Sequence, residues 1–198
     1  MKITILVSAF VTGFIVMAFE MLLGHFLNPF FGSSIMTWGA IISTVLVVLS
    51  LGYFLGGNLA DRFPSGLVIG ILLCCSSIYL FTIPFLSDTL LLKIATDIED
   101  TRVGALLSAI IFAAPLFALG MYSPFAIRLM VLDREHTGGA AGLIYGISTL
   151  GSVFGTLLVA FYLVLYIGSK NITLILAGLT FLVGVLNITV LKPLKILE

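Results

Sequence analysis

The sequence predicts an all-α integral membrane protein, a bundle of six membrane-spanning helices. Of its 198 residues, 61% are hydrophobic and only 9% are charged, whereas an ordinary soluble domain has about 25% charged residues. The hydrophobic residues gather in long stretches, each with the roughly 20 residues that a helix needs to cross a bilayer. Strands of a membrane barrel would need only about ten residues of alternating hydrophobicity. A soluble enzyme is therefore excluded.

The long hydrophobic stretches follow one another with short connections, so we expect residues 1–198 to form a single membrane domain. They cover residues 3–27, 36–60, 66–86, 103–128, 142–166 and 172–191. The longest polar connection, residues 88–102, contains an amphipathic piece at residues 90–95 that predicts a short helix lying on the membrane surface. With no net charge, the chain offers no basic surface for nucleic acid.

The distribution of basic residues predicts the orientation in the membrane, because Lys and Arg near span ends are retained in the cytoplasm. Six of them fall on the side of both termini: Lys2, Arg62, Arg128, Arg134, Lys192 and Lys195. Three fall on the other side: Lys93, Arg102 and Lys170. We therefore expect a multi-pass protein of the plasma membrane with both termini in the cytoplasm.

The fifth stretch has a polar stripe along one side of the predicted helix. The stripe consists of Tyr145, Ser148, Thr149, Ser152 and Thr156, which lie close together at 100° per residue. Two glycine pairs flank it, and the four-residue spacing within each pair lets helix backbones approach closely. These pairs are Gly142 with Gly146 and Gly151 with Gly155. We expect packing against two neighbouring helices, with the hydroxyls turned inward to line a solute path or to bond between helices.

Glu20 is the acidic residue placed deepest within a hydrophobic stretch, and it shares a helix face with Gly13 and Gly24. A carboxylate there costs at least a few kcal/mol unless it is protonated, paired or hydrated. Glu20 is therefore a candidate for a ligand or ion path, the alternative being a structural, hydrogen-bonded acid. His25 follows five residues later, and its protonated ring could pair with Glu20.

The fourth stretch contains two prolines, Pro115 and Pro124. Each proline removes a backbone donor and crowds the preceding turn, which predicts a kink or a break. Broken helices mark binding sites or gates in many transporters. Arg128 ends this stretch, either as an anchor at the membrane surface or as an ion-pair partner.

A family resemblance begins at the turn after the second stretch. Residues 57–62 read Gly-Asn-Leu-Ala-Asp-Arg, which resembles the G-x-L-A-D-R motif of the major facilitator superfamily. The wider pattern adds Glu20, Trp38, the segment 120–128 and the segment 141–156. Together, over residues 20–168, it resembles the N-terminal membrane domain of the fused major-facilitator-like and spermidine-synthase-like family. His25 stands where that family commonly has arginine, and Phe63-Pro64-Ser65 replaces the usual Gly-Arg-Lys.

The resemblance implies a gating motif made of Gly57, Asp61, Arg62, Pro124 and Arg128. Asp61 is expected to pair with Arg128 and to latch an outward-open state. The alternative for Asp61 is a helix N-cap. Six helices equal one half of a twelve-helix facilitator, so a homodimer is expected to supply the second half.

Two functions are compatible with these features. The first is a half-size, transporter-like protein that moves or binds a small cationic or zwitterionic metabolite, such as a polyamine. The second is a non-catalytic membrane anchor or scaffold for a soluble spermidine-synthase-like partner. Two histidines and two adjacent cysteines offer neither a nucleophile-base pair nor a metal cluster, and no glycine-rich nucleotide fingerprint is present. We therefore expect no enzyme activity, no metal and no cofactor.

Overall fold

The computed structural model describes residues 2–131 and 137–191. Their regular structure is entirely helical, which confirms the all-α class. The helices are α1 (Lys2–Phe31), α2 (Ile35–Arg62), α3 (Gly66–Asp97), α4 (Thr101–Ala113), α5 (Leu116–Met130), α6 (Thr137–Leu158), α7 (Val164–Tyr166) and α8 (Ser169–Val190), with the π-helix η2 (Val159–Leu163) between α6 and α7.

The described residues contain five helices long and apolar enough to span a membrane, and six candidate spans if one bent pair of helices is counted as a span. Four of them are the single helices α1, α2, α3 and α8, and the fifth is the continuous run from α6 to α7, Thr137–Tyr166. The sixth is the pair α4 and α5, whose axes are bent by 49°. The chain is therefore a helical membrane bundle.

The bend between α4 and α5 lies at Pro115, as the sequence predicts. The proline has no N–H to donate to Ile111 and crowds the preceding turn. The Ala114 N–H instead reaches the carbonyl of Ile111 at 3.4 Å, and the carbonyl of Pro115 accepts a 2.7 Å hydrogen bond from Ser76 Oγ on α3. Pro124 behaves differently and stays inside the uninterrupted helix α5.

The predicted surface helix at residues 90–95 is wrong. These residues continue α3, which runs without interruption from Gly66 to Asp97. Leu91 is fully buried and Ile94 nearly so, so the apolar side of the amphipathic pattern packs against protein instead of lying on a membrane surface.

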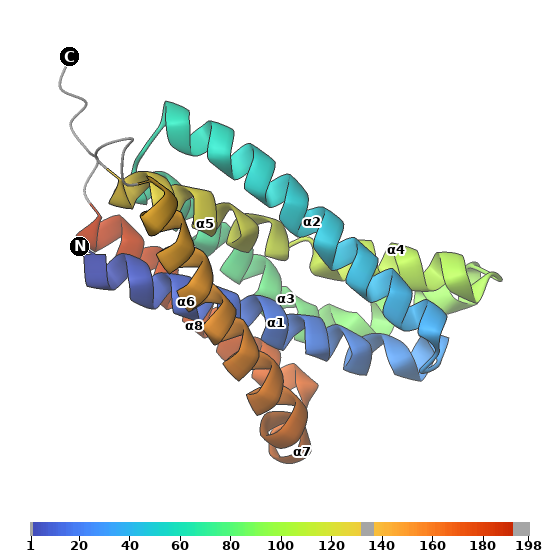
Figure 1. Cartoon of the computed structure of the whole chain (residues 1–198). Coiled ribbons are helices and arrows are strands. Elements are labelled where there is room, and N and C mark those ends of the chain that lie inside the picture. Colours follow the sequence, from blue (N-terminus) through green and yellow to red (C-terminus); the bar gives the residue numbers. More distant parts are fainter. Residues whose placement is uncertain (1, 132–136, 192–198) are drawn as a thin grey trace.

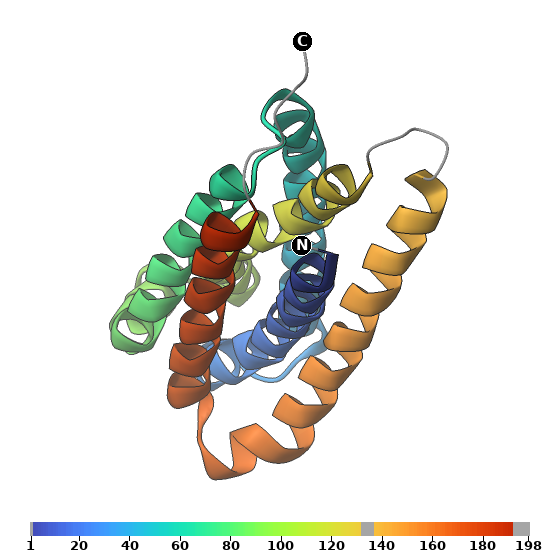
Figure 2. The ribbon, with the colours of Figure 1, turned by 90° about the vertical axis from the view of Figure 1, so that its left-hand side faces the viewer.

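Helix α1 is the central element of the bundle. Figure 2 shows it with α6 on one side and α3 and α8 on the other. Ile15, Ala18 and Leu22 are fully buried, and so are Ile5 and Phe19. The middle of the helix therefore makes protein contacts on all sides, whereas residues nearer its two ends, such as Val7 and His25, are exposed.

Three helix pairs pack most extensively: α3 with α8, α1 with α6, and α2 with α5. In the pair of α1 and α6, Gly151 and Gly155 lie directly against the backbone carbonyls of Phe10 and Phe14. A Cβ atom at either glycine would overlap those carbonyl oxygens. This confirms one of the two predicted glycine seams, the one formed by Gly151 and Gly155.

The pair of α2 and α5 repeats this packing. Gly52 lies against the Phe117 carbonyl, and Gly56 lies against Met121, again four residues apart on both helices. The contacts of α1 with α6 thus correspond to those of α5 with α2. Each of these two pairs therefore maps onto the other when the first three spans are superposed on the last three. Such a correspondence is expected of an inverted repeat, which also occurs within each half of facilitator transporters.

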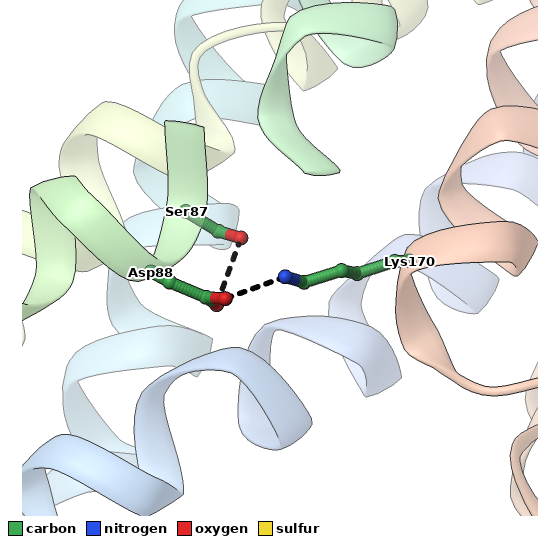
Figure 3. A network of polar contacts seen from close by, with 3 residues as sticks. All are labelled: Ser87, Asp88 and Lys170. Atoms are coloured by element: carbon green, nitrogen blue, oxygen red, sulfur yellow. Dashed lines mark hydrogen bonds and ion pairs between the residues drawn. The ribbon is translucent and has the colours of Figure 1, made fainter. Parts of the chain in front are cut away.

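Polar contacts join α3 and α8 at two places along their length. Ser77 Oγ on α3 donates to the Ala177 carbonyl on α8 at 2.9 Å. Near one end, Lys170 Nζ lies 2.5 Å from Asp88 Oδ2, and Ser87 donates to the other carboxylate oxygen (Figure 3). Because the ion pair is exposed, its contribution to stability is about 1 kcal/mol or less. The α3–α8 pair therefore depends mainly on packing.

Candidate functional site

A polar cavity of about 120 Å³ lies between α1, α2, α5 and α6. Its lining comprises Thr12, Gly13, Val16, Met17, Leu49, Tyr53, Leu119, Gly120, Ser123, Ser148 and Ser152. Hydroxyl groups from all four helices thus face one space, which has room for a few water molecules. A polar cavity in an otherwise apolar bundle is the type of place where membrane proteins bind hydrophilic solutes.

The polar stripe of α6 reaches this cavity with only part of its length. Ser148 and Ser152 line the cavity, and Ser152 Oγ lies within hydrogen-bond distance of the carbonyls of Gly13 and Ser148, at 3.2 and 3.1 Å. Thr156 donates to the Ser152 carbonyl at 3.0 Å. Tyr145 and Thr149 are exposed. The prediction that the whole stripe turns inward is therefore wrong, because α6 packs mainly against one helix.

The second predicted glycine seam has no partner among the described helices of this chain, so it stays a prediction. A Cβ atom at Gly142 or Gly146 would meet no atom within 4 Å among the described residues. Both glycines are exposed, since the side of α6 that carries them has no neighbouring helix in this chain. The spacing of four residues is present, but no described helix of this chain packs against it.

Glu20 is buried in the bundle, with 8% of its surface exposed. It is the only charged residue among those that are buried in the described part of the chain, and it forms no hydrogen bond or ion pair there. Glu20 follows Val16 and Met17 by one helical turn and lies on the same face of α1. The carboxyl group therefore continues the cavity-lining face of α1 by one turn, away from the N-terminus.

Gly24 shows which helix this face approaches beyond Glu20. A Cβ at Gly24 would overlap the Trp38 ring of α2, and Gly13, two turns before Glu20, lies against Ser148 of α6. Glu20 is therefore placed on the side of α1 that faces α2 and α6, in agreement with the predicted orientation into the bundle.

His25 does not pair with Glu20. Its ring is exposed, and its Nδ1 lies 3.1 Å from the carbonyl of Met21 on the same helix. Five residues correspond to a rotation of about 140° around a helix, which directs the two side chains to different faces. The predicted pairing is wrong, and His25 lies outside the cavity.

Asp61 and Arg128 form an ion pair between α2 and α5, with Arg128 Nε 3.4 Å from Asp61 Oδ1. Both side chains are exposed. Asp61 lies in the last turn of α2, so the alternative N-cap role is wrong. Ser65 caps α3 instead, accepting a hydrogen bond from the Leu67 N–H.

The other members of the predicted gating motif are packed loosely. Arg62 is exposed at the end of α2. A Cβ at Gly57 would lie 4.0 Å from the Cβ of Pro124, which is an ordinary contact distance. The gating role of these residues remains a prediction.

Sequence reasoning missed a buried polar cluster that joins α1, α5 and α8. The Tyr122 hydroxyl donates to the Ile5 carbonyl at 3.0 Å, and Asn187 Nδ2 donates to Ser8 Oγ at 3.1 Å. Tyr122 is 1% exposed and Asn187 is fully buried. A tyrosine and an asparagine inside apolar stretches were the available signal, because such side chains need partners in a membrane.

Comparison with known proteins finds a partial similarity to a transport protein. Over 116 residues the chain is 31% identical to the inner membrane transport protein YdhP of Escherichia coli (strain K12). The match covers 59% of this chain but only 26% of that protein, so the chain spans about a quarter of the curated relative's length. No family profile matches the chain. No solved structure matches it.

The chain is thus a helical membrane protein with a distant similarity, over part of its length, to a membrane transport protein. The similarity gives no information about a synthase domain. The soluble partner expected from the sequence stays a prediction, and so does the absence of enzyme activity.

Proposed function

We propose that this protein is a half-size transporter that moves a small cationic or zwitterionic metabolite, of the size and charge of a polyamine, across the plasma membrane. The observation that carries the proposal is the cavity between α1, α2, α5 and α6 together with the unpaired Glu20 on the same face of α1. The similarity to an inner membrane transport protein favours transport over a purely structural role.

The chemistry of the cavity suits a cation with hydrogen-bonding groups. A carboxylate in a low-dielectric environment attracts an ammonium group far more strongly than it does in water. Hydroxyls such as those of Ser123 and Ser148 can replace part of the hydration shell of such a solute. Glu20 would hold the charge, and the hydroxyls would orient the remainder.

A second copy of the chain would complete the site. A volume of about 120 Å³ is smaller than the 300 Å³ or more of a typical ligand pocket. Tyr53 and Tyr145, which flank the cavity on α2 and α6, are 42% and 47% exposed. Lipid tails cannot accept their hydrogen bonds, so this face is better covered by protein. We therefore place the dimer contact along α2 and α6, with both termini in the cytoplasm.

Single cysteines test the dimer contact in a variant that lacks Cys74 and Cys75. Tyr53→Cys and Tyr145→Cys should give disulfide-linked dimers in membranes under mild oxidation. Phe85→Cys is the matched control, because Phe85 is also an exposed aromatic residue, 65% exposed, but lies on α3. Equal cross-linking at all three positions, or cross-linking at Phe85 alone, would exclude this interface.

Purified wild-type protein in liposomes tests transport itself. Uptake of radiolabelled polyamines and amino acids should exceed that of protein-free liposomes and should depend on an imposed pH gradient. A folded protein that takes up none of these compounds would contradict the proposal. That result would favour the membrane-anchor role, which binding assays with soluble synthase-like proteins could then test.

The Asp61–Arg128 pair is expected to act as a latch between two conformations. Asp61→Asn should change the uptake rate by up to about fivefold, because an exposed ion pair contributes about 1 kcal/mol or less. The exchange of both residues, Asp61→Arg with Arg128→Asp, should restore the rate. Unchanged uptake in both single variants, Asp61→Asn and Arg128→Gln, would show that the pair is no latch.

A further inference from the structure

A second polar cleft lies at the end of the bundle opposite the N-terminus, which we call the far end. This end contains residues 32–34 and 98–100 and is on the right in Figure 1. The cleft has a volume of about 290 Å³ and is lined by Ser34, Met36, Thr37, Glu99, Asp100, Thr101, Arg102 and Ala105. It thus lies where α2 and α4 begin, with two acidic residues in its lining. Both helices run inward from this cleft.

Buried hydroxyls without partners lie below the cleft on both helices. Ser108 follows Ala105 by one turn of α4 and is fully buried, and Thr44 follows Thr37 by two turns of α2 and is 6% exposed. Neither hydroxyl has a hydrogen-bond partner within the described residues. Residues seven apart differ by only about 20° around a helix, so Thr44 continues the face of α2 that lines the cleft.

These two hydroxyls differ from others in the bundle. Ser43 and Thr180 donate to carbonyls of the preceding turn, which is how such residues usually satisfy themselves in membrane helices. Thr44 and Ser108 leave this bond unmade, and Asn28 Oδ1 on α1 is also buried without a partner. Buried polar groups are almost always satisfied by protein or by ordered water. Water is therefore the natural partner for these atoms.

Helix packing gives the depth of these three groups relative to Glu20, with Ser108 and Asn28 nearer the cleft and Thr44 deeper. A Cβ on Gly104 of α4 would contact the Phe31 ring of α1, which sets Ser108 and Asn28, each about one turn inward, at similar depth. The contact of Gly24 with Trp38 likewise relates α1 to α2. From it, Glu20 lies about 6 Å and Thr44 about 9 Å further inward at 1.5 Å per residue.

We propose that a file of ordered water molecules runs from the far-end cleft past Ser108 and Asn28 to the level of Thr44 and Glu20, and conducts protons to Glu20. A hydronium ion in the cleft passes a proton along the waters to the Glu20 carboxylate, which becomes a carboxylic acid while the hydronium becomes water. Release reverses these steps. The inference rests on the proposed function, in which Glu20 is the group that couples transport to protons.

Between the lining of the cleft and Glu20, the helices in the described part of the chain bring no further charged side chain to this path. The charged groups of the helices that pack against α1 all lie in terminal segments: Asp61 and Arg62 on α2, Asp88, Lys93 and Asp97 on α3, Arg102 on α4, Arg128 on α5 and Lys170 on α8. The tyrosines of these helices and His25 form no hydrogen bond with Glu20. Glu20 is thus the proton acceptor at the inner end of the path.

Silver ions test the path, because they react with a thiolate in water but do not enter lipid. In a variant that lacks Cys74 and Cys75, Thr44→Cys and Ser108→Cys should be blocked by silver added at the far end at least about tenfold faster than Leu46→Cys, since a thiol in apolar surroundings stays protonated and inert. Leu46 is the matched control because it is 60% exposed on the opposite side of α2. Labelling of residual thiols after denaturation gives the rates.

Slow reaction at Thr44→Cys, or equal rates at Thr44→Cys and Leu46→Cys, would overturn the proposal. Asn28→Cys replaces Ser108→Cys if the latter does not fold, as judged by gel filtration. The assay needs no transported solute, so its outcome is separate from that of the uptake experiments. Fast reaction of the cysteines without any solute uptake would support the water path and contradict the transporter. Solute uptake by a protein whose introduced cysteines do not react with silver would support the transporter and contradict the water path.

Discussion

Replacement of Gly151 by leucine is expected to abolish the folded bundle. The glycine lies against the backbone carbonyl of Phe10, and a Cβ atom would overlap it. Backbone cannot yield as a side-chain tip does, so α1 and α6 must separate, and Gly155 then loses its contact with Phe14 as well. The expected loss is at least about 3 kcal/mol, the upper range for overpacking. Gel filtration and thermal unfolding in detergent measure it.

Gly146→Leu is the matched control for this prediction. Gly146 lies on the same helix, five residues earlier, and a Cβ there would meet nothing within 4 Å. The same substitution should therefore leave the monomer folded, with a change in unfolding temperature of a few degrees at most. If both variants unfold alike, the contact of Gly151 with Phe10 does not determine the effect, and the packing account of α6 is wrong.

Tyr122→Ala is expected to be the second most damaging change. The ring is 1% exposed at the junction of α1 and α5, and its hydroxyl donates to the Ile5 carbonyl. Truncation leaves a large cavity and removes the hydrogen bond to Ile5, with an expected cost of about 3 to 5 kcal/mol. Tyr122→Phe removes only the hydrogen bond and should cost about 1 to 2 kcal/mol.

Tyr162→Ala provides the comparison for Tyr122→Ala. Tyr162 is 64% exposed in η2, so its removal should change the unfolding temperature little. The predicted order of stability is wild type and Tyr162→Ala first, then Tyr122→Phe, then Tyr122→Ala. A Tyr122→Ala protein as stable as wild type would show that the cluster joining α1, α5 and α8 contributes nothing.

The all-helical class and the long apolar helices could be predicted because bilayer thickness fixes helix length. The break at Pro115 could also be predicted, since it follows from the chemistry of one residue. The end of α3 could not. An amphipathic pattern at residues 90–95 is the same whether the apolar side lies on a membrane or on neighbouring helices, and only the packed structure distinguishes the two.

The candidate site was predictable in part for a similar reason. Glu20 could be singled out because a buried carboxylate is costly wherever it lies. The two glycine pairs of α6 have the same spacing, and nothing local distinguishes Gly142 with Gly146 from Gly151 with Gly155. Which pair has a neighbour depends on where α1 lies. The bond between Tyr122 and Ile5 spans 117 residues, a separation at which sequence patterns carry no signal.

The measurement that tests the central claim most directly is uptake by Glu20→Gln protein in liposomes, compared with wild type, under an inward proton gradient. Glutamine keeps the size of the side chain but can neither carry a negative charge nor accept a proton. Ser77→Ala is the control, because Ser77 is buried between α3 and α8 and bonds to Ala177, outside the cavity lining.

We predict that Glu20→Gln lowers uptake about tenfold or more, which corresponds to about 1.4 kcal/mol. Uptake by Ser77→Ala, and the unfolding temperatures of both variants, should stay near the wild-type values. Wild-type uptake that persists unchanged in Glu20→Gln would contradict the account, because the only buried charge of the described bundle would then have no part in transport.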